Sequence, residues 1–267
     1  MRIGRRSVVI LAVAVGAAAV AGIALAAPNG DSSSVQGSKF SPSTLPKDTF
    51  KTGSLFVHTH AHYANPGNSN PGGATDRAQL YFDDDGKLNT TGIPKCDPAD
   101  VSSGDMAHAM SVCGSAKVGG GTAQAITNGG AFFINGCVLL FNGKPDAAGH
   151  ATNLVFTRVN VAQPSTISCS NPATNHQGNV TVLLRGVVKP NPTSLPADFV
   201  GGKMLDVQHI TQAAAFPLTD FKVTAQRGSY ISARCHDADH KLNIRGKFTY
   251  NDGQSDTVNS QQTCTVG

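Results

Sequence analysis

The sequence predicts an all-β protein, an antiparallel β-sandwich of the immunoglobulin-like or jelly-roll-like type with one short helical insertion. The first observation is compositional, because all 17 acidic residues are aspartate and the chain contains 29 glycines, so helix formers are scarce. The second is a series of short apolar or alternating segments, and the third is the turn residues between them. Many short strands at close spacing are typical of a sandwich.

Eleven segments have the alternating or continuous apolar character that predicts strands. They are 54–63, 78–82, 121–127, 132–141, 153–159, 179–188, 205–210, 216–225, 230–235, 242–250 and 256–264. Dipeptides that favour tight turns occur at Asp85-Gly86, Asn142-Gly143, Arg227-Gly228 and Asp252-Gly253. The glycine run 119–121 lacks the Lys-Ser/Thr pair of a phosphate-binding loop, and we expect it to be a flexible hinge.

One segment, 97–113, departs from the strand pattern. Asp97 and Pro98 are suited to the N-cap and first position of a helix, and the apolar residues that follow recur at helical spacing. Those residues are Met106, Ala109, Met110 and Cys113. We therefore expect a short helical insertion near residues 97–113.

The chain begins with the features of an export signal. Arg2, Arg5 and Arg6 precede the uncharged run 7–25, and Ala24-Leu25-Ala26 is a small-x-small cleavage site. Cleavage would leave no stable membrane span, whereas the alternative is that 7–25 stays as an uncleaved anchor. The paired arginines leave both the general secretory route and the twin-arginine route open.

The expected domain organisation follows from this signal and from the composition after it. The segment after the cleavage site is rich in serine and poor in apolar residues, as in a tether. We predict a signal peptide at 1–26, a flexible linker at 27–39 and one β-sandwich domain at 40–267. The mature protein is expected to be secreted or extracytoplasmic, in the cell envelope or outside the cell.

In an oxidising compartment the six cysteines are expected to form disulfides rather than a metal site. Six cysteines allow 15 pairings, and pairing of nearest neighbours is the arrangement we favour. It joins Cys96 to Cys113, Cys137 to Cys169, and Cys235 to Cys264.

Charge and composition exclude several classes of function. The first 26 residues hold three of the 21 basic residues and no acid, so the rest of the chain is close to neutral. A neutral chain without tryptophan argues against nucleic acid as a partner. The absence of glutamate excludes the HExxH zinc-protease motif and glycosidases that use a pair of glutamates.

Several strings in the chain resemble a group of exported actinobacterial proteins of unknown function. They are 80–86, 92–96, 113–119, 218–224, 229–235, 246–253 and 262–264. The resemblance spans most of the mature chain. It implies an exported β-rich domain with local disulfides and supplies no catalytic residue.

The sharpest chemical signal is an alternating row of histidines. If 54–63 is a strand, His58, His60 and His62 project from one face about 6.6 Å apart, and two or three of them can share a zinc or copper ion. The alternative is that the row is the solvent face of an edge strand. A second pair, His236 and His240, would complete the metal site if the fold brought it to the row.

From these observations we expect a secreted or cell-surface protein with a non-enzymatic binding or structural role and no cofactor. Its partner would be an unidentified cell-envelope or extracellular ligand. Two alternatives remain open. One is a zinc or copper protein that uses the histidine row, and the other is a cell-wall or glycan hydrolase that acts through a pair of aspartates.

Overall fold

The computed structural model describes residues 32–63, 74–127, 132–161, 168–210 and 217–267. The predicted signal peptide at 1–26 and the first part of the predicted linker lie outside the described residues. Within them, most of the regular structure is antiparallel strand, and this confirms the all-β class with two short helices.

Eleven strands form one continuous antiparallel sheet in the order β1-β4-β12-β7-β8-β9-β10-β11-β5-β14-β15. Their bounds are β1 (Ser32–Ser41), β4 (Ser54–His62), β5 (Thr75–Phe82), β7 (Lys117–Thr127), β8 (Phe132–Gly143), β9 (Thr152–Val159), β10 (Val180–Pro190), β11 (Lys203–Val207), β12 (Leu218–Ala225), β14 (Lys241–Tyr250) and β15 (Ser255–Thr263). Each of the eleven predicted segments overlaps one strand of the structure.

Short elements complete the fold. Strands β3 (Lys51–Thr52), β13 (Ile231–Ala233) and β6 (Gly86–Leu88) form a three-stranded sheet, while β16 (Thr265–Val266) and β2 (Thr44–Leu45) form a parallel pair. The helices are α1 (Pro98–Val101), α2 (Met106–Cys113) and the single 3-10 turns η1 (Gly114–Ala116), η3 (Pro172–Thr174) and η4 (Ala197–Phe199).

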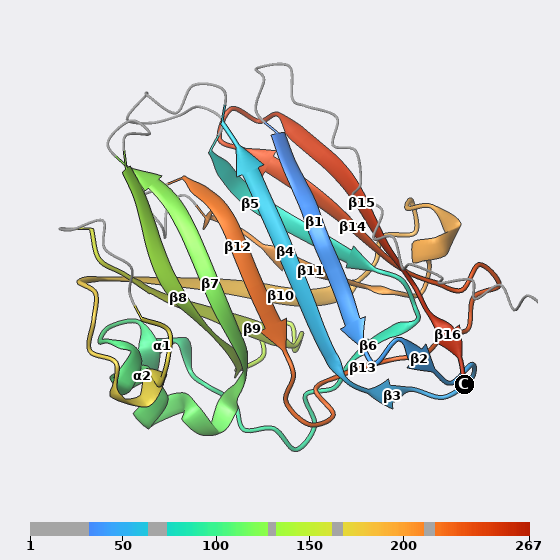
Figure 1. The fold of residues 1–267 in the computed structure, drawn as a ribbon, viewed down its shortest axis with the longest axis horizontal. Coiled ribbons are helices and arrows are strands. Elements are labelled where there is room, and N and C mark those ends of the chain that lie inside the picture. The colour runs from blue at the N-terminus through green and yellow to red at the C-terminus, as the bar shows by residue number, and fades with distance from the viewer. Residues whose placement is uncertain (1–31, 64–73, 128–131, 162–167, 211–216) are drawn as a thin grey trace, which may run out of the picture.

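The long sheet folds over on itself into two layers, as Figure 1 shows. Strands β8, β7, β12, β4 and β1 form one layer, and β9, β10, β11, β5, β14 and β15 form the other. The two layers of the sandwich are therefore halves of a single hydrogen-bonded sheet. The sequence did not distinguish this arrangement from two separate sheets.

The first and last strands of the sheet, β1 and β15, meet side by side at a seam (Figure 1). Side chains connect them there. The Ser33 backbone N–H donates to Asp256 Oδ2 at 2.8 Å, and the Gln262 amide group pairs with both the N–H and the carbonyl of Phe40. These side-chain bonds satisfy backbone groups that the end of a sheet leaves unpaired.

The seam changes the predicted boundary of the folded domain. Residues 32–39 were expected to belong to a linker, but they form most of β1 and pair with β4. The expectation was wrong because a serine-rich segment can also form a strand when a neighbouring strand pairs with it. In the structure Ser33 and Val35 are 2% and 1% exposed, since this strand faces the interior at every second residue.

A dense core lies on the outer face of β8 and β9, under the helical insertion. Asp97 accepts a hydrogen bond from the Ala99 N–H at 3.0 Å and caps α1, as predicted, while Asp105 caps α2. The apolar side of the two helices packs on outward residues of the two strands. The buried members are Cys96, Val101, Met106, Ala109, Cys113, Ala116, Cys137, Leu139, Phe141, Leu154 and Phe156.

Three disulfides link elements that are close in the chain. They join Cys96 to Cys113, Cys137 to Cys169, and Cys235 to Cys264, which is the nearest-neighbour pairing favoured from the sequence. The first ties the helical insertion together, and the third joins the segment after β13 to the end of β15. Three disulfides indicate an oxidising environment.

Two sequence predictions about loops were wrong. Asn142 and Gly143 end β8 instead of forming a turn, because the buried Asn142 amide donates to the carbonyls of Ile93 and Pro94, both at 3.1 Å. The run 119–121 is part of strand β7 and not a hinge. A Cβ at Gly121 would lie 1.8 Å from the Lys222 carbonyl oxygen, so glycine is required there for β12 to approach.

Candidate functional site

The main candidate site is an apolar cavity of about 210 Å³ between the two layers of the sheet. Its wall combines inward-facing residues of both layers. Those used below are Leu55, Val57, Leu140, Val155, Leu184 and Val223. Because strand residues alternate between faces, each of these strands turns the residues named here inward and their immediate neighbours outward.

The cavity exists because small side chains alternate with large ones along its wall. Ala61, Ala78 and Ala225 stand at lining positions on β4, β5 and β12. Alanine at an inward position of a sheet leaves room that valine or leucine would fill. The two layers therefore meet without closing the space between them.

The polar groups in the wall are satisfied by one another. The Tyr230 hydroxyl donates to Asn153 Oδ1, and burial raises the pKa of Tyr230, so this phenol stays protonated. At another point of the wall Thr75 lies 3.5 Å from the hydroxyl of Tyr63, which itself donates to the Leu218 carbonyl at 2.6 Å. An apolar guest would thus meet few unpaired polar atoms in these parts of the wall.

The histidine row lies on the opposite face of the same strand. β4 turns Leu55 and Val57 inward and His58 and His60 outward, as the alternating sequence requires. His62, at the end of β4, is exposed. The His58 and His60 rings therefore point outward, although His60 also borders the cavity.

Asp220 joins the histidine row from the neighbouring strand. Its Oδ2 is 2.6 Å from His58 Nε2 and 3.7 Å from His60 Nδ1, and its Oδ1 is 2.9 Å from Lys222 Nζ. Burial acts to raise the pKa of Asp220, but hydrogen bonds from His58 and Lys222 outweigh it, so that this pKa lies below its usual range. The carboxylate is accordingly ionised at neutral pH.

The second predicted histidine pair sits in a different environment. His236 Nδ1 is 3.3 Å from Asp48, and His240 Nδ1 lies 3.9 Å from the Cys235 sulfur, in the segment between β13 and β14. These partners of His236 and His240 differ from that of His58 on β4, which is Asp220.

One cluster of three aspartates resembles a cation site only because its carboxylates lie close together. In the described part of the chain, only Asp84, Asp85 and Asp237 form a set of three ligand side chains whose atoms lie within 4.8 Å of one another. Arg234 already pairs with Asp84 and Asp85 at 2.7 and 2.9 Å. Asp85, which is fully buried, also accepts from the His236 backbone N–H.

This acidic group therefore stabilises the turn after β5. It also bears on the hydrolase alternative, which requires two carboxylates in an open cleft. Asp85 is held by an arginine and by backbone donors instead. Asp237 has a raised pKa, mainly because of its burial and then because of Asp85 and Asp84.

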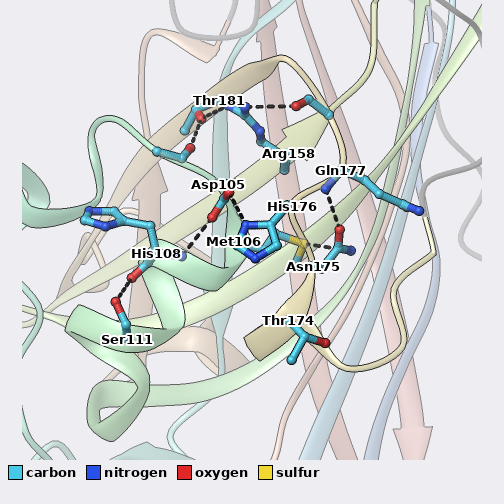
Figure 2. A network of polar contacts seen from close by, with 12 residues as sticks. Asp105, Met106, His108, Ser111, Arg158, Thr174, Asn175, His176, Gln177 and Thr181 are labelled. Carbon is cyan, nitrogen blue, oxygen red and sulfur yellow. Dashed lines mark hydrogen bonds and ion pairs between the residues drawn. The ribbon is translucent and has the colours of Figure 1, made fainter.

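A polar network on the outer surface holds the segment after η3 to the helical insertion (Figure 2). Asp105 accepts from the His108 backbone N–H at 2.8 Å and lies 2.7 Å from His176 Nδ1. Arg158 donates to Thr181 and to the Gly178 carbonyl. These contacts connect α2 with β9 and β10 and lie away from the cavity wall.

Within the described residues no helix is long and apolar enough to cross a membrane. Comparison of the chain with known protein families, with curated proteins and with solved structures found no match. The fold and the site define an all-β protein with an internal apolar cavity and an outward histidine row. Its function has to be argued from that geometry.

Proposed function

We propose that this chain is an exported, non-enzymatic binding protein that holds a small apolar molecule between the two layers of its sheet. The observation that carries the proposal is the cavity of about 210 Å³ with a wall that is largely aliphatic. Concave, mostly apolar sites with few polar groups are the usual form of small-molecule pockets. The resemblance to exported actinobacterial proteins remains a prediction and adds no ligand.

The volume of the cavity limits the size of the molecule that it can hold. An engineered apolar cavity of about 150 Å³ stays dry and binds benzene or xenon. The cavity of this protein is larger, about 210 Å³, and so has room for a molecule somewhat larger than benzene, such as a substituted ring or a short acyl chain.

Energetics favour occupation. Residual volume costs about 24 cal/mol per Å³ in a closed void, so about 5 kcal/mol is the upper limit of the packing lost in a cavity of this size, which is partly open to solvent. That is comparable to the whole stability of a marginal domain, which is about 5–15 kcal/mol. A guest that fills the space would recover much of this free energy.

The proposed location agrees with the covalent structure. The three disulfides indicate an oxidising compartment, and the predicted signal peptide at 1–26 would take the chain there. The guest would then be met outside the cytoplasm, in the cell envelope or the medium.

Titration of the oxidised protein with the uncharged fluorescent probe N-phenylnaphthylamine tests the proposal. Val223→Phe places a larger side chain inward in the cavity, whereas Thr224→Phe makes a similar change at the next residue, which faces outward. We expect Val223→Phe to weaken probe binding by at least about tenfold, a loss of about 1.4 kcal/mol, and Thr224→Phe to leave it unchanged.

Two outcomes would overturn the proposal. One is a wild-type protein that does not bind this probe and yields no apolar molecule on extraction. The other is equal probe affinity in the wild type and in a folded Val223→Phe variant. Far-ultraviolet circular dichroism of both variants shows whether the sheet is intact.

A further inference from the structure

A β-bulge in β12 sends two nearby residues to opposite faces of the sheet. Leu218 pairs with Ala125 and Asp220 pairs with Gln124, so Thr219 is an extra residue in the register, and its hydroxyl donates to the Gln124 carbonyl on β7 at 3.1 Å. In a regular strand, residues two apart share a face. Here the Leu218 side chain packs with the apolar residues of the interior, whereas the Asp220 carboxylate turns outward to His58, although Asp220 also borders the cavity. Bulges of this kind re-aim side chains and occur next to functional sites.

The re-aimed carboxylate meets the histidine row. Asp220 is the register partner of His60 on β4, and its Oδ2 is approached by nitrogens of both His58 and His60. The side chains of His58 and Asp220 are 15% and 18% exposed, while that of His60 is 41% exposed. The group is therefore sheltered and still open to solvent on one side.

We propose that His58, His60 and Asp220 bind a divalent transition-metal ion, Cu²⁺ or Zn²⁺, on the outer face of the sheet. Two imidazoles and a carboxylate are a donor set that suits both ions. The fourth position would be left to water. His60 and Asp220 also border the cavity, but the proposed metal site lies on the outer face and does not depend on the proposed apolar ligand.

Closure around an ion requires the histidine rings to move, because the ligand atoms of His58, His60 and Asp220 are not all within 4.8 Å of one another in this structure. In a tetrahedral zinc site with bonds of about 2.0–2.1 Å, the ligand atoms are roughly 3.4 Å apart. His60 Nδ1 and Asp220 Oδ2 are at 3.7 Å already, whereas His58 Nε2 at 2.6 Å makes a hydrogen bond that must lengthen. The half-exposed His60 ring is free to turn toward the ion, which would replace the proton between His58 and Asp220.

The charge of Lys222 provides a test, because its removal should change metal affinity in a known direction. Its ammonium group lies 2.9 Å from Asp220 Oδ1 and competes with a cation for the same carboxylate. Replacing it with an uncharged side chain of similar length should therefore strengthen metal binding. A structural role for the carboxylate would predict no gain.

The experiment is calorimetric titration of the metal-free, oxidised, untagged protein with Cu²⁺ and with Zn²⁺. We expect one equivalent of each, with Cu²⁺ bound more tightly. The double variant His58→Ala, His60→Ala should lose at least about a hundredfold in affinity, and Lys222→Met should gain severalfold. His176→Ala removes a histidine from a different His–Asp pair, at 2.7 Å, and should change nothing.

The contrary results are equally specific. The site is excluded if the folded wild type binds neither ion, or if the double variant binds them as the wild type does. It is also excluded if His236→Ala, His240→Ala abolishes binding while the β4 variants retain it. Because removal of His58 also removes its hydrogen bond to Asp220, far-ultraviolet circular dichroism of each variant is needed to show that loss of binding is not loss of fold.

Discussion

Leu139 and Leu140 are neighbours in β8, yet they belong to two differently packed regions. Leu139 faces outward under the helical insertion and is 2% exposed, among phenylalanines and leucines that are fully buried. Leu140 faces inward and lines the cavity of about 210 Å³. The same residue type thus closes a core on one face of the sheet and leaves a space on the other.

This difference concerns how the two faces of the sheet are packed, since the buried aliphatic cluster between the layers borders a cavity. A sandwich normally depends on the contact between its layers. Here the helices and the disulfide Cys96–Cys113 cover the outer face of β8 and β9 and provide a dense second core. The space between the layers is then available to a ligand.

Truncation of the two leucines gives the largest expected contrast. Leu139→Ala should lower the free energy of unfolding by about 3–5 kcal/mol, because it opens a new void in a close-packed core. Leu140→Ala should cost only about half as much, because its side chain already lacks partners on one side. Urea unfolding of the ligand-free proteins measures both. Equal losses would remove the distinction between the regions.

The disulfide beneath the helices offers the next contrast. Cys96→Ala with Cys113→Ala removes a link across 17 residues and should cost about 3 kcal/mol in the chain-entropy model. Because this bridge stabilises the outer core only, the folded variant should bind N-phenylnaphthylamine with wild-type affinity. Loss of probe binding in a variant that is still folded would show that the two regions are not independent.

Two buried carboxylates, Asp206 and Asp83, differ in their hydrogen-bond partners. Asp206, on the outer face of β11, accepts from Arg77, Lys189 and Gln208. Burial acts to raise its pKa, but these hydrogen bonds outweigh it and hold the pKa below its usual range. Asp83, beside a smaller cavity of about 50 Å³, has no cation among its described hydrogen-bond partners.

Burial raises the pKa of Asp83 to about 8, and the neighbouring carboxylates Asp85, Asp237 and Asp84 act in the same sense. An unfolded aspartate ionises near pH 4, so between about pH 4 and pH 8 the folded protein holds a proton that the unfolded chain has lost. The contribution of this group therefore makes the free energy of unfolding fall as pH rises through that window.

The smallest expected effect is that of Asp83→Asn on the pH dependence of the free energy of unfolding. Between pH 6 and pH 8 the wild type should lose about 2 kcal/mol more than the variant, because the amide does not ionise. Urea unfolding at the two pH values gives the difference, and the exposed substitution Asp239→Asn is the control. Parallel pH profiles of wild type and Asp83→Asn would contradict the assignment.

The strands were predictable because each of them alternates or is continuously apolar within a few residues. β1 was missed because a serine-rich strand has no such pattern, and it is held by partners more than 200 residues away, such as Asp256 and Gln262. Asn142 was misjudged for a related reason, since its side chain binds carbonyls about 50 residues earlier.

Only some residues of the candidate sites could be predicted from the sequence. The spacing of the histidines on β4 places them on one face, as the structure shows for His58 and His60. Asp220 was not predicted, because a single bulge at Thr219 decides which face it occupies. The cavity is a property of two layers that meet in space, and no local pattern encodes it.

The most direct test of the central claim is native mass spectrometry of the oxidised protein recovered after export from cells. The account predicts one small apolar molecule per chain, present in the wild type and in Thr224→Phe and lost from Val223→Phe. A wild-type protein that is free of any guest, both as exported and after incubation with apolar molecules of suitable size, would contradict it.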